Sequence, residues 1–132
     1  MVKRLPKSFH CATEFTLFIL GGKWKTVILC FLKERPCRYA ELRKLLPKLS
    51  DKVLTERLHD LIDSGLVVRG RRGLGQAQEY RLTQRGRHLT GILRHLDAWG
   101  VENAPSFNVV VGTPLTDLDY ERRRDGTGTR RA

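Results

Sequence analysis

The chain has 132 residues, of which 40% are hydrophobic, so it is long enough for one cored domain and too short for two. No apolar run approaches the ~18 residues that a membrane-spanning helix needs, and residues 1–7 lack the apolar segment of a secretory signal, so we expect a cytoplasmic protein. Lysine and arginine outnumber acidic residues by 25 to 14, a net charge of +11. Residues 105–132 hold five arginines against four acidic residues, so almost all of this charge lies in the body and favours a polyanionic partner such as DNA.

Two helices are expected before residue 35. Residues 14–20 form an apolar stretch that Gly21 and Gly22 end, as suits a helix C-terminus followed by a sharp turn. In residues 23–34 apolar side chains recur at three- and four-residue spacing. This spacing predicts an amphipathic helix, which Pro36 ends.

After a short strand, a shorter and a longer helix are expected. Residues 39–46 place leucines on one side and charged residues on others, and Pro47 closes this helix. Ser50 is a natural N-cap and Gly65 a natural C-terminal stop for a helix through residue 64. Two helices joined by such a turn have the proportions of a helix-turn-helix, whose second helix enters the major groove of DNA.

A β-hairpin is expected directly after the longer helix. Residues 66–69 and 79–82 are strand-like, and residues 70–76 between them are rich in glycine and arginine. A hairpin at this place is the wing of a winged helix. Thr83 then caps a further helix with an apolar stripe, residues 107–111 are a candidate for a short strand, and the composition beyond Pro114 favours disorder.

Several short motifs follow one another over residues 11–100. They are Cys11 with Glu14, Gly21-Gly22-Lys23-Trp24, Arg38-Tyr39-Ala40-Glu41-Leu42, Leu49-Ser50-Asp51-Lys52-Val53-Leu54-Thr55 with Leu58, Gly65-Leu66-Val67, Glu79-Tyr80-Arg81-Leu82-Thr83-Gln84-Arg85-Gly86, and Trp99-Gly100. In this order and spacing the chain resembles the HxlR-type winged helix regulators of bacteria. Two positions depart from the family, which usually has proline at Ala12 and a proline pair within Gly73–Gln78. The second departure predicts a more flexible wing tip.

The fold class expected is α+β, mainly α: a winged helix-turn-helix with a three-helix core, a two-stranded wing and terminal dimerisation helices. Residues 1–104 are expected to form this HxlR-type winged helix domain for DNA binding and dimerisation. Residues 105–132 are expected to be a C-terminal tail, partly extended or disordered. The unit that reads DNA runs from Arg38 to Leu82.

The longer helix is the expected recognition helix, and its outward polar side chains suit base edges or phosphates. This helix carries a net charge of −2 over residues 50–64, so the grip on the DNA backbone must come from the supporting helix and the wing. The alternative is that these side chains are the solvated face of an amphipathic helix. The predicted contacts are Ser50, Asp51, Lys52, Thr55, Glu56 and His59 on the recognition helix, Arg38, Arg43 and Lys44 on the supporting helix, and Arg69, Arg71 and Arg72 in the wing.

The terminal helices carry more apolar side chains than a core of this size must hide. The family resemblance implies dimerisation through these helices, and a two-fold dimer fits a palindromic operator. The alternative is packing within one chain. The residues predicted at the interface are Phe15, Phe18, Ile19, Leu89, Ile92, Leu93, Leu96 and Trp99.

The three cysteines argue against a disulfide framework because their number is odd. The sequence has no CxxC pair, so a metal site is not expected either. Cys11 begins the first predicted helix near His10 and Lys7, an arrangement that can lower a thiol pKa. The resemblance implies that some relatives sense oxidants or electrophiles at this position, and an inert cysteine is the equal alternative. Cys30 is expected to be a buried packing residue and Cys37 to be exposed in a turn.

The function expected is therefore a sequence-specific DNA-binding transcriptional regulator, with repression the expected mode. It is expected to act as a homodimer on double-stranded DNA, with no cofactor, no metal and no membrane, and its small-molecule effector is not identified. The alternatives are a non-specific architectural DNA-binding protein, which the charge alone would support, and a winged helix that binds proteins. No phosphate-binding glycine loop, nucleophile–base set or catalytic carboxylate pair is visible, so an enzyme is not expected.

Overall fold

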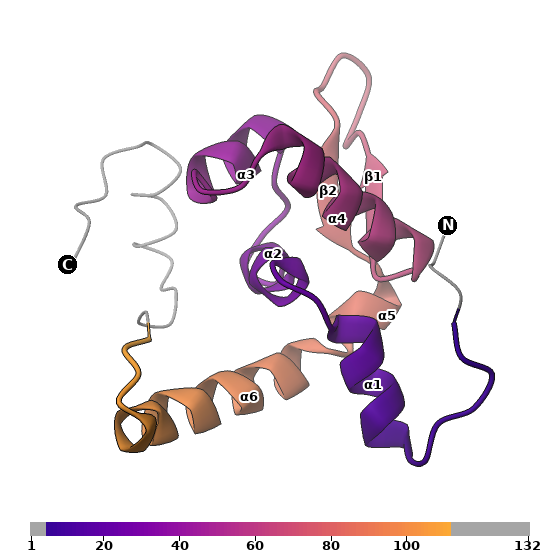
Figure 1. Cartoon of the computed structure of the whole chain (residues 1–132). Helices are drawn as coiled ribbons and strands as arrows, with labels where there is room; N and C mark the ends of the chain where they lie inside the picture. Colours follow the sequence, from indigo (N-terminus) through magenta and orange to yellow (C-terminus); the bar gives the residue numbers. More distant parts are fainter. Residues whose placement is uncertain (1–4, 112–132) are drawn as a thin grey trace.

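A computed structural model describes residues 5–111 of the chain (Figure 1). The elements in chain order are α1 (Ala12–Leu20), α2 (Lys25–Leu32), α3 (Tyr39–Leu45), α4 (Asp51–Asp63), β1 (Val67–Gly70), β2 (Glu79–Leu82), α5 (Gln84–Arg87), α6 (Thr90–Asn103) and the 3-10 turn η1 (Ala104–Phe107). The predicted fold class is confirmed. The first four helices and both strands begin and end within two residues of the expected positions.

The helix α2 lies at the centre of the molecule. The pair α3 and α4 and the β-hairpin lie on one side of it, and α1, α5 and α6 lie on the other (Figure 1). Ile28 and Leu29 of α2 are fully buried, as are Leu54, Leu58 and Leu61 of α4. The α4 leucines recur at helical spacing, so α4 buries one face and leaves the other in water, whereas the central α2 exposes only Val27.

Both ends of α4 are fixed by local signals in the sequence. The Ser50 hydroxyl accepts a hydrogen bond from the backbone N–H of Val53 (3.2 Å), which satisfies one of the free donors at the helix start. Gly65 takes a left-handed conformation (φ +74°), and the next residue, Leu66, donates back to the carbonyl of Leu61 (3.0 Å). The chain therefore leaves α4 directly into β1.

The hairpin is a two-stranded antiparallel sheet in which Val67 pairs with Leu82 and Gly70 pairs with Glu79. A bridge between Cys37 and Tyr80 adds a short third segment beside β2, with backbone hydrogen bonds of 2.7 and 3.0 Å. Where a short strand is expected before α3, the chain makes only this one-residue bridge. It ties the start of the helix-turn-helix to the wing.

Three expectations are corrected. Cys37 is buried, not exposed, because its bridge to Tyr80 lies on the core. Residues 107–111 form no strand; the chain makes the turn η1, Asn108 is left-handed (φ 56°), and the residues after it are irregular. The helix capped by Thr83 ends after one turn, and α6 follows as a separate helix. The tail expected beyond residue 111, including the disorder after Pro114, lies outside the described residues.

Within residues 5–111 no single helix has the length and apolarity to cross a membrane. Among these residues, α1 and α2 taken together have the required length and apolarity, but the two helices are bent by 85° at the break between them.

The contact between α5 and the α4–β1 corner yields a stability prediction. A Cβ at Gly86 would overlap the backbone carbonyl of Leu66, whereas a Cβ at Gly91 of α6 would meet nothing within 4 Å. Gly86→Ala should lower the free energy of unfolding by about 2 kcal/mol because backbone must move. Gly91→Ala should raise it by about 0.5–1 kcal/mol because alanine favours the helix. Urea unfolding of both variants measures the difference, and equal stabilities would contradict this packing.

Candidate nucleic-acid interface

The helix α4 turns its polar side chains away from the core. Leu54 and Leu58 are buried, and the side chains that alternate with them are exposed. The structure places the predicted recognition-helix residues together on this outer surface, and the exposed ones are Ser50, Asp51, Lys52, Thr55, Glu56 and His59.

A network of three side chains holds the start of α4 against α3. The Tyr39 hydroxyl donates to the Asp51 carboxylate (2.6 Å), and Arg43 Nε lies 3.0 Å from the same oxygen. Arg43 also donates to the backbone carbonyl of Leu49, in the turn between the helices. Hydrogen bonding to Asp51 stabilises the neutral hydroxyl and raises the pKa of Tyr39. Arg43 and Asp51 therefore position α4 in this conformation, and the charge of each is partly balanced by the other.

Sequence reasoning missed two members of this surface. Tyr39 was not among the predicted contacts because its partner Asp51 lies twelve residues away, on the next helix. Lys48 was also missed, although it lies in the turn that joins the two helices of the motif. Its side chain is exposed, like those of Lys44 and Lys52, and no ion pair joins any of these three lysines to another side chain of residues 5–111. They form a row of unpaired cations around the start of α4.

The wing adds arginines in three different states. Arg69 lies over the ring of Tyr80, with 5.8 Å between its guanidinium carbon and the ring centre. Arg72 pairs with Glu79 (Nε to Oε1 2.7 Å), although its side chain is still 61% exposed. Arg71 is exposed and has no ion pair among the described residues. The Arg71 charge is therefore exposed and not balanced by an acidic side chain of this part of the protein.

The apolar surface lies on the other side of α2, over α1 and α6 (Figure 1). Five of the residues predicted at a dimer interface are between 41% and 62% exposed, and they are Phe15, Phe18, Ile92, Leu96 and Trp99. Ile19 and Leu89 are partly buried against the core. Leu93 is only 3% exposed, so it belongs to the chain's own core, and we leave it out of the interface.

All three cysteines are free thiols in different surroundings. Cys11 is exposed at the N-cap of α1, and the neighbouring His10 ring pairs with Glu14 (3.2 Å). Cys30 is half-buried, and burial raises the pKa of its thiol. Cys37 is buried. Exposure therefore makes Cys11 the most accessible of the three to a reagent from solution.

Comparison with known proteins finds transcriptional regulators of similar sequence and fold. A family model described as HxlR-like helix-turn-helix matches residues 19–107. The HTH-type transcriptional regulator YtcD of Bacillus subtilis (strain 168) is 38% identical over 114 residues, which are 86% of this chain and 88% of that protein. Among solved structures, the redox regulator HypR in its reduced form is similar with a TM-score of 0.69 and 31% identity, over 74% of this chain and 98% of that one. Quinone-bound YodB from B. subtilis is similar with a TM-score of 0.59 and 30% identity, over 68% and 96% of the two chains.

Proposed function

The chain belongs to the HxlR-like helix-turn-helix family, and from that membership we propose that it is a sequence-specific repressor that binds a palindromic operator as a homodimer in the bacterial cytoplasm. That it is a transcriptional regulator with a helix-turn-helix DNA-binding fold follows from the family itself. We propose repression because a dimer bound to its operator excludes other proteins from the same stretch of DNA. We expect no catalytic activity and no cofactor.

The observation that carries the proposal is the exposed polar surface of α4, with unpaired cations around it. Lys52 and Thr55 are exposed on this surface, from which they would reach base edges in the major groove. Lys44 and Lys48 beside them and Arg71 in the wing supply charge for the phosphates, whose neutralisation dominates affinity. Sequence would thus be read by α4, and the backbone gripped from both flanks.

A homodimer is supported by the apolar side chains left in water over α1 and α6. Burial of large apolar side chains away from water is favourable in free energy. Those left exposed here are Phe15 and Phe18 on α1 and Ile92, Leu96 and Trp99 on α6. A two-fold interface places the same surface of both copies together, so α1 and α6 of one copy would cover α1 and α6 of the other. Because this surface lies across α2 from α4, both recognition helices stay open to DNA (Figure 1).

We also propose that Cys11 makes DNA binding respond to oxidants or electrophiles. Its thiol is exposed at the start of α1, the helix that carries part of the proposed dimer surface. Alkylation of this thiol by an electrophile, or its oxidation to a disulfide with the Cys11 thiol of the second copy as diamide takes up the two electrons and two protons, would alter the packing between the two copies. Two of the similar structures are described as a redox regulator and as a quinone-bound protein, and this supports the proposal.

Sequence reading and backbone grip should separate by mutation. Lys52→Ala should reduce the preference for the operator over random duplex by about 1–3 kcal/mol, because a base contact is lost. Arg71→Ala combined with Arg72→Ala should weaken binding to both duplexes and flatten the salt dependence by about one to two units in slope. The operator is first selected from random duplexes. The affinity of each variant for the operator and for random duplex is then measured as a function of salt concentration.

Arg94→Ala is the matched control, because this exposed arginine lies on α6, away from α4 and the wing. It should leave the slope unchanged. A wild-type protein with less than about a thousandfold preference for its selected site would favour the architectural alternative, which the net charge of +11 supports. Equal losses on both duplexes for Lys52→Ala would show that α4 does not read sequence.

The dimer is tested with one leucine from each side of the molecule. Leu96→Glu places a charge in the proposed interface and should give monomers in sedimentation velocity at micromolar concentration. Leu74→Glu, at the fully exposed tip of the wing, should remain a dimer like the wild type. Monomers in all three samples would remove the homodimer proposal.

The role of Cys11 is tested by treating the protein with diamide before DNA binding. Operator affinity of the wild type should fall by about tenfold, a typical coupling between two sites. Cys11→Ser should keep its affinity, whereas Cys30→Ser should behave as the wild type because the half-buried Cys30 thiol stays protonated. A Cys11→Ser variant that still loses affinity in diamide would refute this role.

A further inference from the structure

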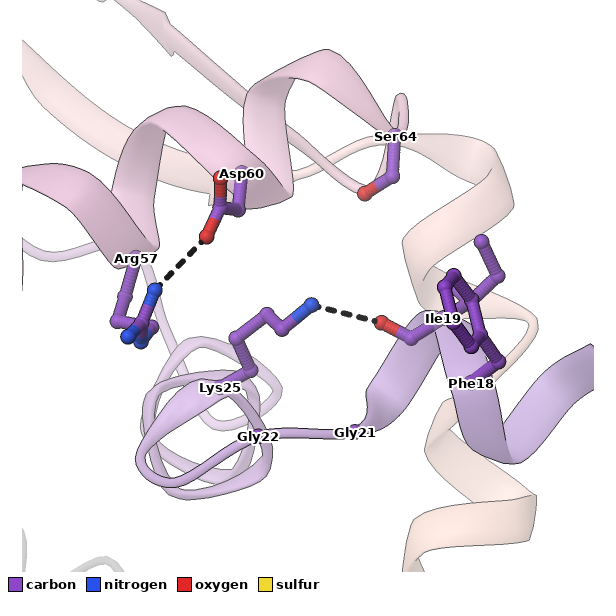
Figure 2. Close-up of a pocket in the computed structure, with 8 residues that line it drawn as sticks. All are labelled: Phe18, Ile19, Gly21, Gly22, Lys25, Arg57, Asp60 and Ser64. Carbon is purple, nitrogen blue, oxygen red and sulfur yellow. Dashed lines mark hydrogen bonds and ion pairs between the residues drawn. The ribbon is translucent and has the colours of Figure 1, made fainter. Parts of the chain in front are cut away.

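A pocket of about 370 Å³ opens between α1, α2 and α4 (Figure 2). Its lining comes from the end of α1, the glycine turn, the first residue of α2 and the second half of α4. This volume is at the lower end of the range for small-molecule sites, about 300–1,000 Å³. The pocket is separate from the surface of α4 that carries Lys52 and Thr55.

One wall of the pocket is apolar and its floor is bare backbone. Phe18 and Ile19 form the wall on α1 (Figure 2). Gly21 and Gly22 follow without side chains, and Gly22 has a left-handed conformation (φ +95°) that a larger residue would strain. The turn therefore leaves open the space in front of Lys25.

The opposite part of the pocket carries two cations with unused donors. Lys25 Nζ donates to the backbone carbonyl of Ile19 (3.2 Å), which employs one of its three N–H groups. Arg57 donates one Nη1 hydrogen bond to Asp60 (3.0 Å), and its buried Nε has no hydrogen-bond partner. With Asp60 as the one carboxylate among the lining residues, the pocket has a net charge of +1.

We propose that this pocket binds a small monocarboxylate with an apolar body, an aromatic acid of the size of benzoate. The carboxylate would accept hydrogen bonds from Lys25 and Arg57, and the ring would pack on Phe18 and Ile19. A single negative charge matches the single excess positive charge of the lining. Charge-assisted hydrogen bonds of this kind are roughly twice as strong as neutral ones.

This ligand would regulate DNA binding, an extension that rests on the function proposed above. Arg57 and Asp60 lie on α4 itself, about one and two turns beyond Lys52. A bound carboxylate would compete with Asp60 for Arg57 and link α4 to Lys25 of α2, so it would change the contacts that hold α4 in place. We therefore expect bound ligand to weaken operator binding, and bound operator to weaken ligand binding by the same factor.

The test uses the full chain and titrates it with benzoate, without DNA, in a calorimeter. Benzoate should bind, and benzamide, its neutral analogue, should bind at least about tenfold more weakly. Lys25→Gln should weaken benzoate binding by about tenfold or more. Lys23→Gln removes the same charge two residues away, outside the pocket, and should change affinity less than about twofold. Equal binding of benzoate and benzamide, or equal effects of the two lysine variants, would overturn the site.

Asp60→Asn distinguishes the loss of a ligand contact from a general destabilisation of the fold. It removes the carboxylate that competes for Arg57, so benzoate should bind more tightly, in the direction opposite to Lys25→Gln. Weaker binding by Asp60→Asn would count against the proposal. Saturating benzoate should then lower operator affinity about five-fold or more, and no change would remove the regulatory link. If benzoate binds as described but the protein binds no DNA, the proposed function fails and the pocket stands.

Discussion

The packing of the α4 leucines against α2 is the constraint on which the rest of the molecule depends. Leu54, Leu58 and Leu61 occupy one face of α4, and burying all three fixes the rotation of the helix about its axis. Once that rotation is set, Lys52 and Thr55 must point into water. The same rotation turns Arg57 and Asp60 toward α1 and α2, where the pocket lies. A loss of this packing would disturb both surfaces together.

The net charge of −2 on the recognition helix opposes DNA binding, and the structure removes part of this conflict. Asp51 is engaged by Tyr39 and Arg43, and Asp60 is engaged by Arg57. These acids balance cations of the protein itself and present little uncompensated charge to a phosphate. The unpaired cations lie at the edges of α4 instead. In the proposed function, sequence reading and electrostatic grip are carried by different elements, and a count of charges along one helix does not reveal this.

Local signals explain why so much of the fold could be predicted from the sequence. Ser50 caps α4, Gly65 ends it, and the leucine spacing defines its buried face; each effect acts within a few residues. The contacts that sequence reasoning missed are between distant residues. Tyr39 meets Asp51 only after α3 and α4 pack, and Cys37 becomes buried only when it bridges to Tyr80.

The apolar residues of α6 show the same limit. Leu93 and Leu96 belong to one predicted stripe, yet Leu93 fills the core and Leu96 lies in water. Periodicity identifies an apolar face but does not divide it between the chain's own core and a partner. Likewise, the pattern of residues 107–111 suits a strand, but no free strand edge is paired with them. The pocket was not anticipated either, because its lining comes from three separate helices.

The helix α4 is therefore shared between two kinds of chemistry. Its first half faces solvent with side chains suited to DNA, and its second half closes a pocket against α1 and α2. The helix is short and regular, capped at one end and stopped by a left-handed glycine at the other, so it moves as one body. A ligand that displaced α4 through Arg57 would displace Lys52 as well, because both residues lie on this helix. In the proposed two-fold dimer the displacement would occur in both copies. The distance between the two α4 helices must match one turn of the DNA helix, so a small displacement of each would weaken the fit to both half-sites.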